Sequence, residues 1–239
     1  MANPYFQFKQ FTIYHDKCAM KVTTDACLFG AWCAQQLQSI HPKNLMDIGT
    51  GTGLLSLMIA QKNSVQIDAI EIDNTAAEQA RENTRSSPWK DQINIITGDI
   101  RSFAPGKKYD CIISNPPFYQ DELTSLSHQK NIAHHGTHLQ LGELVSILKT
   151  HLQTGGCFFL LLPYKRSKQA EDILAHSELF IHKKTFVKQS LMHSNFRVLL
   201  MGSNKKTNVQ LADTISIKNK EDKYTNEFTT LLKEYYLYL

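Results

Sequence analysis

The sequence lacks the cysteine patterns of disulfide-stapled and zinc-binding proteins. It has 239 residues and five cysteines, an odd number, and no two cysteines form a C-x-x-C pair. Disulfide frameworks belong mainly to secreted proteins, and structural zinc sites need closely spaced ligands. We therefore expect free thiols in a reducing compartment and no bound metal.

Long apolar runs and targeting signals are missing as well. The longest apolar runs, such as Cys157–Leu162, are too short to cross a bilayer. The first 30 residues lack the basic start, apolar middle and small-residue cleavage site of a signal peptide. Hydrophobic residues still make up 42% of the chain, enough for a core. We expect one α/β domain in the cytoplasm, without a membrane partner.

Neither charge sign is in large excess. The formal net charge is +4, which is compatible with a nucleic-acid partner and does not require one. Six basic residues are concentrated in the final third of the chain, namely Lys183, Lys184, Lys188, Arg197, Lys205 and Lys206. They form either a solvated face or a set of phosphate contacts.

The most informative stretch is Leu45–Leu57. A short apolar run ends with an acid at position 47, three glycines follow at alternate positions, and a helical apolar pattern begins at Leu54. The pattern predicts a strand, a tight turn and a helix. Glycine permits positive φ and close approach of a ligand, which the amides at the helix start would face. The dinucleotide fingerprint G-x-G-x-x-G does not fit, because Leu54 occupies the third glycine position.

The spacing Asp-x-Gly-x-Gly-x-Gly resembles the S-adenosylmethionine (SAM) loop of class I methyltransferases. SAM carries an ammonium group and no pyrophosphate, which suits an acid at the end of the strand. A glycine-rich turn without a ligand is the alternative. The cofactor-binding residues expected in this loop are Asp47, Gly49, Thr50, Gly51, Gly53 and Leu54.

A helix is expected to precede this loop. Thr23 or Thr24 is a good N-cap, and Ala26–Leu37 has helical spacing. This helix packs on the sheet, or it also brings Lys21, Thr24 and Asp25 beside the glycine loop, at the amino-acid end of the ligand.

An acid also ends the next predicted strand, Val65–Ile72. Glu71 lies 22 residues after Gly49, where nucleotide-binding α/β folds place an acid that accepts ribose hydroxyls. Ile72 is expected beside it in the cofactor site. Asp73 competes for the ribose role, but it fits better as the N-cap of a helix over residues 75–84.

The third strand, Ile93–Thr97, is followed by Gly98, Asp99 and Ile100. An acid in this place resembles the methyltransferase position that accepts the adenine amine of SAM, with Ile100 packed on the ring. Taken alone, Asp99 is a common turn residue.

The fourth strand, Tyr109–Ser114, leads into Asn115-Pro116-Pro117-Phe118. Two prolines fix φ and remove two backbone donors, so neither helix nor sheet can continue. The Pro116 carbonyl and the Asn115 side-chain carbonyl are then free acceptors for a planar amino group, on which Phe118 can stack. A bare Asn-Pro-Pro turn is the alternative.

The chemistry follows from what Asn115 cannot do. It is not a base, and the lone pair of an exocyclic amine or amide is delocalised. Two acceptors in the plane of that amine favour a tetrahedral nitrogen and aim its lone pair at a methyl group. We therefore expect direct transfer, with the proton leaving afterwards.

The rest of the chain is expected to complete the sheet. The polar segment Gln120–His138 is expected to form a loop, and its four histidines have no acid or cysteine paired with them at the spacing of a metal site. Glu178–Lys188 and Asn195–Met201 suggest an antiparallel strand pair. Thr214–Lys218 suggests a short strand, and Asn226–Leu239 a helix with packed tyrosines.

Taken in order, these motifs resemble the bacterial tRNA1(Val) adenine-37 N6-methyltransferase family. The resemblance spans nearly the whole chain, and the segments that carry it are Lys21-Val-Thr-Thr-Asp-Ala, the glycine loop, Glu71, Ser87-Pro-Trp89, Asp99, Asn115-Pro-Pro-Phe, Arg197-Val-Leu-Leu200, Tyr224–Glu227 and Tyr235-Tyr-Leu-Tyr-Leu239. The family often has Tyr in place of Phe118, and either ring can stack.

The resemblance implies a Rossmann-like class I methyltransferase with a seven-stranded, mostly parallel sheet, its last strand antiparallel, and helices on both faces. Residues 1–40 would cover the cofactor site, residues 41–202 would form the core sheet, and residues 203–239 would add a strand and a helix. SAM would be converted to S-adenosylhomocysteine. The implied catalytic residues are Asn115, Pro116, Pro117 and Phe118, and the implied substrate-binding residues are Phe118, Tyr119 and Arg197.

The implied substrate is the anticodon loop of a tRNA, bound by a monomer, with the target base unstacked. N5 methylation of a glutamine in a release factor or ribosomal protein is the same-chemistry alternative, although only about 40 residues precede the loop. DNA adenine methylation is a weaker alternative, because the chain leaves no room for a domain that reads the DNA sequence. A catalytically idle RNA-binding module is the alternative from another class.

Overall fold

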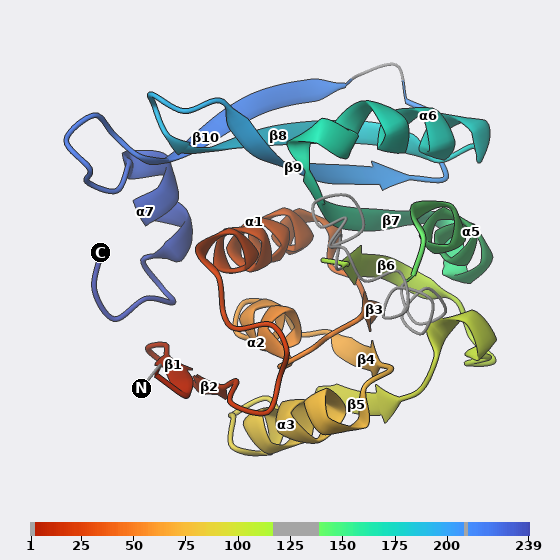
Figure 1. Cartoon of the computed structure of the whole chain (residues 1–239). Helices are drawn as coiled ribbons and strands as arrows, with labels where there is room; N and C mark the ends of the chain where they lie inside the picture. Colours follow the sequence, from red (N-terminus) through yellow and green to blue (C-terminus); the bar gives the residue numbers. More distant parts are fainter. Residues whose placement is uncertain (1–2, 117–138, 208–209) are drawn as a thin grey trace, which may run out of the picture.

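The computed structural model of the chain describes residues 3–116, 139–207 and 210–239. Its main sheet consists of β3 (Asn44–Ile48), β4 (Gln66–Glu71), β5 (Ile93–Thr97), β6 (Tyr109–Ser114), β7 (Leu152–Pro163), β8 (Phe180–Ser190), β9 (Asn195–Ser203) and β10 (Leu211–Lys218). The spatial order is β10-β8-β9-β7-β6-β3-β4-β5. Strand β9 is antiparallel to β7 and β8, and the other neighbouring pairs are parallel (Figure 1).

The Rossmann-like architecture with an antiparallel strand is confirmed, but the expected count of seven strands is wrong by one. The additional strand is β10, which begins at Leu211, three residues before the expected start, and joins the outer edge of β8 in parallel. Ile215 pairs with Val187 there, and Ile215 and Ile217 are buried against the core. The sequence predicts a strand in this place, but the edge on which it docks depends on distant residues.

Helices cover both faces of the sheet (Figure 1). The described helices are α1 (Thr24–Ile40), α2 (Leu54–Ala60), α3 (Asn74–Arg85), α5 (Leu141–His151), α6 (Ser167–His176), α7 (Asn226–Leu232) and the 3-10 helices η1 (Ile100–Ser102) and η3 (Tyr164–Arg166). One core cluster joins α1, α2 and α7 to one face, and the other joins α5 and α6 to the opposite face. A separate hairpin of β1 (Tyr5–Gln7) and β2 (Thr12–Tyr14) packs with the first group.

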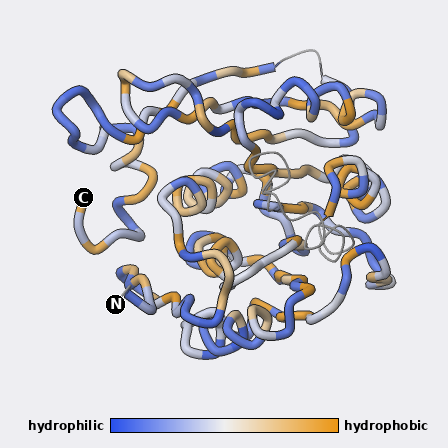
Figure 2. Tube along the Cα trace, in the orientation of Figure 1, coloured by the Kyte–Doolittle hydropathy of each residue, from blue (hydrophilic) through white to orange (hydrophobic). Residues whose placement is uncertain are grey.

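The sequence of the central strands explains this two-sided burial. Side chains alternate between the faces of a strand, so Leu45 joins one core cluster while Met46 and Ile48 join the other. Parallel strands with helices on both faces need apolar residues at nearly every position. Figure 2 shows this as orange along the central strands, with blue concentrated in the peripheral loops.

The carboxyl ends of β3 and β6 place two of the predicted motifs together. Ile48 is in register with Ser114, so the glycine turn after β3 and Asn115 after β6 start at the same edge of the sheet. Helix α1 ends at Ile40, just before β3 begins, so its first turn lies back at this carboxyl edge. Ligands of open α/β sheets bind at this edge.

The C-terminal helix is shorter than expected. It ends at Leu232 instead of Leu239. Tyr235 and Tyr236 are buried, and the Tyr235 hydroxyl donates to the Met58 carbonyl of α2 at 3.0 Å. Tyr238 is 89% exposed, so the expectation that all these tyrosines pack is wrong for this residue. Among the helices of the described residues, none has the length and hydropathy needed to span a bilayer.

Candidate active site

The glycine loop has the backbone geometry expected of a ligand cradle. Gly49, Gly51 and Gly53 have φ angles of 71°, 57° and 81°, a region that favours glycine. A Cβ built on Gly49 or Gly51 would meet no atom within 4 Å, so the backbone there borders open space. The α2 helix begins directly afterwards at Leu54. A bound group can therefore approach this backbone without displacing a side chain.

Most of the loop amides, however, are bonded within the protein. The N–H groups of Gly49 and Thr50 donate to the Ile70 carbonyl at 2.9 and 3.1 Å, and that of Gly53 donates to the Thr50 carbonyl at 3.0 Å. The Gly51 amide donates to a carboxylate oxygen of Glu71 at 2.8 Å. These four N–H groups therefore hold the turn itself, whereas the expectation concerned the amides at the start of α2.

Asp47 lies beneath the loop, completely buried. Its Oδ2 accepts hydrogen bonds from the hydroxyls of Thr50 and Ser56, each at 2.7 Å, while Oδ1 is buried without a partner in the described part of the chain. Burial raises the pKa of this carboxyl to about 6, against the opposing effect of the two hydroxyl donors. This carboxylate ties the turn to the first part of α2.

Glu71 ends β4 and connects three parts of the site. One carboxylate oxygen accepts the Gly51 amide at 2.8 Å, and the other accepts the Asp73 amide at 3.0 Å. Asp73 caps α3 through a 2.7 Å bond from the Ala76 amide, which confirms its predicted capping role. Each Glu71 oxygen retains a second lone pair, so the carboxylate can still accept hydroxyl donors.

Asp99 and Ile100 lie differently from a simple adenine site. The Asp99 carboxylate accepts Nε and Nη2 of Arg101 at 2.9 and 2.7 Å, and the Arg101 guanidinium lowers its pKa. Ile100 is 8% exposed and belongs to the core, whereas Ile72 is 47% exposed. Ile72 is therefore the more exposed of the two isoleucines expected in the cofactor site.

Asn115 follows β6 at the same edge and is half-buried, and Pro116 is buried. The Ser114 hydroxyl donates to the Ile48 carbonyl at 2.9 Å, which links the last residues of β6 and β3. Asn115 is therefore held beside the start of the glycine loop. Pro117, Phe118 and Tyr119 lie outside the described residues, as does the histidine-containing loop.

A residue that the sequence did not single out links the N-terminal hairpin to the loop. Asn83 of α3 is 2% exposed and exchanges two 2.9 Å hydrogen bonds with the backbone of Tyr14. Its amide also donates to the Thr52 carbonyl at 2.9 Å. Helix α3 holds Lys17 nearby through Gln79 and Glu82. No local pattern marks Asn83, since its partners are 31 and 69 residues away.

Residues at the start of α1 lie at the carboxyl edge. Lys21 and Thr24 are exposed, and Thr23 caps the helix by accepting the Ala26 amide. Asp25, in the first turn, accepts a 2.8 Å hydrogen bond from Nε of Arg197 on β9. The structure thus brings Arg197 to the same edge as Asn115, through Asp25, which the sequence placed near the glycine loop but did not pair with Arg197.

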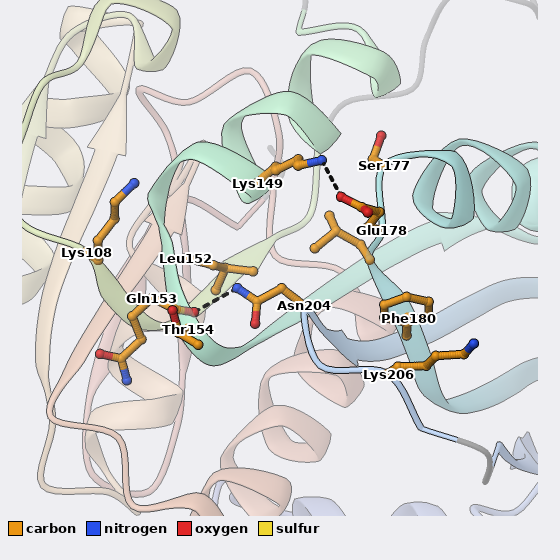
Figure 3. Close-up of a pocket in the computed structure, with 11 residues that line it drawn as sticks. Lys108, Lys149, Leu152, Gln153, Thr154, Ser177, Glu178, Phe180, Asn204 and Lys206 are labelled. Carbon is orange, nitrogen blue, oxygen red and sulfur yellow. Dashed lines mark hydrogen bonds and ion pairs between the residues drawn. The ribbon is translucent and has the colours of Figure 1, made fainter.

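A hollow of about 840 Å³ lies at the opposite, amino-terminal edge of the sheet (Figure 3). The Lys149 ammonium lies 3.0 Å from the Glu178 carboxylate. The side-chain amide of Asn204 donates to the Gln153 backbone carbonyl. Lys108 and Lys206 lie on different sides of the hollow and do not converge (Figure 3). Its lining contains none of the predicted catalytic or cofactor-binding residues, and Lys206 is the one candidate phosphate contact in it.

The described residues contain no group of three or more histidine, cysteine or acidic side chains that could hold a metal. All five cysteines are free thiols. Burial raises the pKa of Cys18 to about 11 and that of Cys27 to about 12, which keeps both protonated near neutral pH.

The chain is similar to known methyltransferases. Residues 31–174 match the family described as "Methyltransferase small domain". The chain is 39% identical over 239 residues to a protein of Phocaeicola vulgatus named tRNA1(Val) (adenine(37)-N6)-methyltransferase, covering 99% of each chain. A Bacteroides fragilis protein of the same name is 37% identical over 240 residues, also with 99% of each chain covered.

A solved structure supports the fold alone. A predicted O-methyltransferase from Agrobacterium tumefaciens aligns with a TM-score of 0.64 at 14% identity, over 88% of this chain and 96% of that one.

Proposed function

This chain belongs to the tRNA1(Val) (adenine(37)-N6)-methyltransferase family, and we propose that it methylates N6 of adenine 37 beside the anticodon of tRNA1(Val). The observation that carries this proposal is the position of Asn115. Asn115 follows β6 beside the glycine loop, at the carboxyl edge of the sheet. There the Ser114 hydroxyl donates a hydrogen bond to the Ile48 carbonyl. A planar amine that reaches Asn115 thus lies next to a cradle for a methyl donor.

The residues present fit SAM as that donor. SAM supplies an electrophilic methyl group on a sulfonium, and S-adenosylhomocysteine is the product. Open space borders Gly49 and Gly51, and exposed Ile72 lies beside the Glu71 carboxylate. Glu71 would accept the ribose hydroxyls with its remaining lone pairs.

The other cofactor contacts have a more indirect basis. Lys21 and Thr24 are exposed at the start of α1 and would approach the amino-acid end of SAM. Asp47 would act mainly by holding Thr50 and the turn, because it is fully buried. Asp99 would accept the adenine amine only by sharing its carboxylate with Arg101.

Asn115 and Pro116 would orient the nucleophile. The Asn115 side-chain carbonyl and the Pro116 main-chain carbonyl each accept one N–H of the adenine amine. This geometry favours a tetrahedral nitrogen whose lone pair points toward the methyl donor. Neither group takes the proton, which leaves to solvent after the new C–N bond has formed. Preorganised acceptors of this kind contribute about 10²- to 10³-fold in rate.

The base-stacking side of the site lies outside the described residues. By the resemblance of Asn115-Pro-Pro-Phe, Phe118 would stack on the adenine, and Tyr119 and Arg197 would contact the RNA. Pro117 would fix the turn that presents Phe118. The adenine must leave its stack to enter such a pocket.

The proposal treats the chain as one domain that acts as a monomer. Residues 1–40 would cover the cofactor, residues 41–202 would form the catalytic sheet, and residues 203–239 would extend and brace it. The Asn83 bonds to Tyr14 and Thr52 support the covering role of the N-terminal segment.

Methyl transfer from labelled SAM tests the function directly. Purified protein is offered unmodified tRNA1(Val), the same tRNA with guanine at position 37, and a glutamine-containing release factor. Label in the first tRNA alone, recovered as N6-methyladenosine, is expected. Label in the release factor would favour N5-glutamine methylation, and SAM binding without transfer would favour an idle RNA-binding module.

A further inference from the structure

Arg197 and Asp25 approach each other from elements that are far apart in the chain. Arg197 lies in the first residues of β9, in register with Pro163 at the carboxyl end of β7. Asp25 lies in the first turn of α1, at the same edge of the sheet. Nε of Arg197 donates to Oδ2 of Asp25 at 2.8 Å, across 172 residues of sequence.

Only one edge of the guanidinium is used in this contact. Within the described residues, Nη1 and Nη2 of Arg197 donate no hydrogen bond. The Arg197 side chain is 35% exposed, whereas that of Asp25 is 15% exposed. The guanidinium carbon also lies 5.3 Å from the centre of the Phe196 ring. One edge of the guanidinium is thus anchored, and the opposite edge is open to a ligand.

A guanidinium held in this way suits a phosphate. Its planar pair of Nη groups matches two oxygens of one phosphate, which the single ammonium of lysine cannot do. An exposed arginine normally loses rotamer entropy when it is fixed. The bond to Asp25 removes part of that loss before any ligand arrives.

We propose that Asp25 is a positioning residue that orients Arg197 to bind a backbone phosphate of the RNA next to the target nucleotide. This inference rests on the proposed function, and it adds the chemical group bound and the residue that prepares the site. Phosphate contacts set the register of a nucleic acid on a protein without reading its sequence. Arg197 therefore fixes the depth at which the flipped adenine meets Asn115.

Four variants test the role of the open guanidinium edge. Arg197→Lys keeps the charge and loses the paired donors, and Arg197→Gln loses both. Asp25→Asn removes the anchor, and Arg197→Lys/Asp25→Asn combines two changes. Lys168→Gln is the matched control, since Lys168 is an exposed cation on α6 paired with Asp172. The measurements are kcat and KM for tRNA1(Val), the Kd for SAM, the thermal midpoint and the salt dependence of tRNA binding.

The expected results separate charge from geometry. Arg197→Lys raises KM for the tRNA about tenfold with an unchanged SAM Kd, because a bidentate contact becomes a single one. Arg197→Gln also lowers the slope of log K against log salt by about one, as loss of one phosphate contact requires. Asp25→Asn raises KM several-fold, but adds little in the Arg197→Lys background. Lys168→Gln changes none of these values.

Two outcomes overturn the inference. One is a tRNA KM that stays at the wild-type value in Arg197→Lys and Arg197→Gln. The other is an Asp25→Asn effect that is equally large in the Arg197→Lys background, which would make Asp25 only a part of α1. If wild-type protein places no methyl group in tRNA, the proposed function itself fails, and that result is distinct from either outcome.

Discussion

Glu71 accepts the backbone amide of Gly51 at 2.8 Å, and this bond joins the end of β4 to the middle of the glycine loop. The same carboxylate accepts the Asp73 amide at the start of α3. An acid expected only to bind a ribose therefore also holds the shape of the cofactor cradle.

Replacing Glu71 by Gln tests this double role. Gln can accept one of the two amides, but its own NH₂ group then faces the other donor, and the negative charge is lost. We expect the Kd for SAM to rise about tenfold or more, measured by calorimetry. Glu78→Gln is the control, because Glu78 is an exposed residue of α3 that pairs with Arg81. This substitution should leave the Kd for SAM unchanged. An unaltered Kd in Glu71→Gln would move the ribose role to Asp73.

Asn115→Ala should separate catalysis from cofactor binding. The substitution removes a side-chain acceptor but leaves the glycine loop intact, so kcat should fall by about 10²- to 10³-fold or below detection. The SAM Kd should stay within about twofold of wild type. Asn94→Ala on β5 serves as an exposed asparagine control. Full turnover by Asn115→Ala would show that the nucleophile is oriented by other groups.

The pH dependence of stability should report the buried Asp47. Burial raises its pKa to about 6 from 3.8, so the folded protein binds this proton more tightly than the unfolded chain does. Its contribution to the free energy of unfolding is therefore fully present below pH 3.8 and is lost as the pH rises through 6. The difference between the two values corresponds to at most about 3 kcal/mol.

Urea unfolding of wild type and Asp47→Asn between pH 4 and pH 7.5 checks this sign. Because asparagine does not titrate, the variant should gain stability relative to wild type as the pH rises. Asp91→Asn, at an exposed position, controls for general charge effects. A stability difference that is constant over this range would mean that Asp47 keeps an ordinary pKa in the folded protein.

Asn83→Ala should loosen the N-terminal hairpin from the loop. The substitution leaves the backbone N–H and carbonyl of Tyr14 without their partner, and likewise the Thr52 carbonyl. We expect a loss of about 1–3 kcal/mol in the free energy of unfolding and weaker SAM binding. Asn74→Ala, exposed at the start of the same helix, is the control. Equal effects of the two substitutions would assign the loss to α3 alone.

Local sequence determined much of this protein. Apolar alternation and the caps at Thr23 and Asp73 predict the central strands and the starts of α1 and α3, because these signals act within a few residues. The glycine spacing predicts the positive φ angles of the turn for the same reason. Asn115 follows β6 as expected, because a strand cannot continue through two prolines.

The tertiary structure decided which distant groups meet. Sequence alone could not place β10 beside β8. The position of an edge strand depends on which distant apolar residues its own apolar face can pack against. It could not show that Asp47 is fully buried, or that Arg101 already holds Asp99. The bonds from Asn83 to Tyr14 and from Arg197 to Asp25 span 69 and 172 residues. Such contacts form only when the whole sheet and its helices are assembled, so no local pattern encodes them.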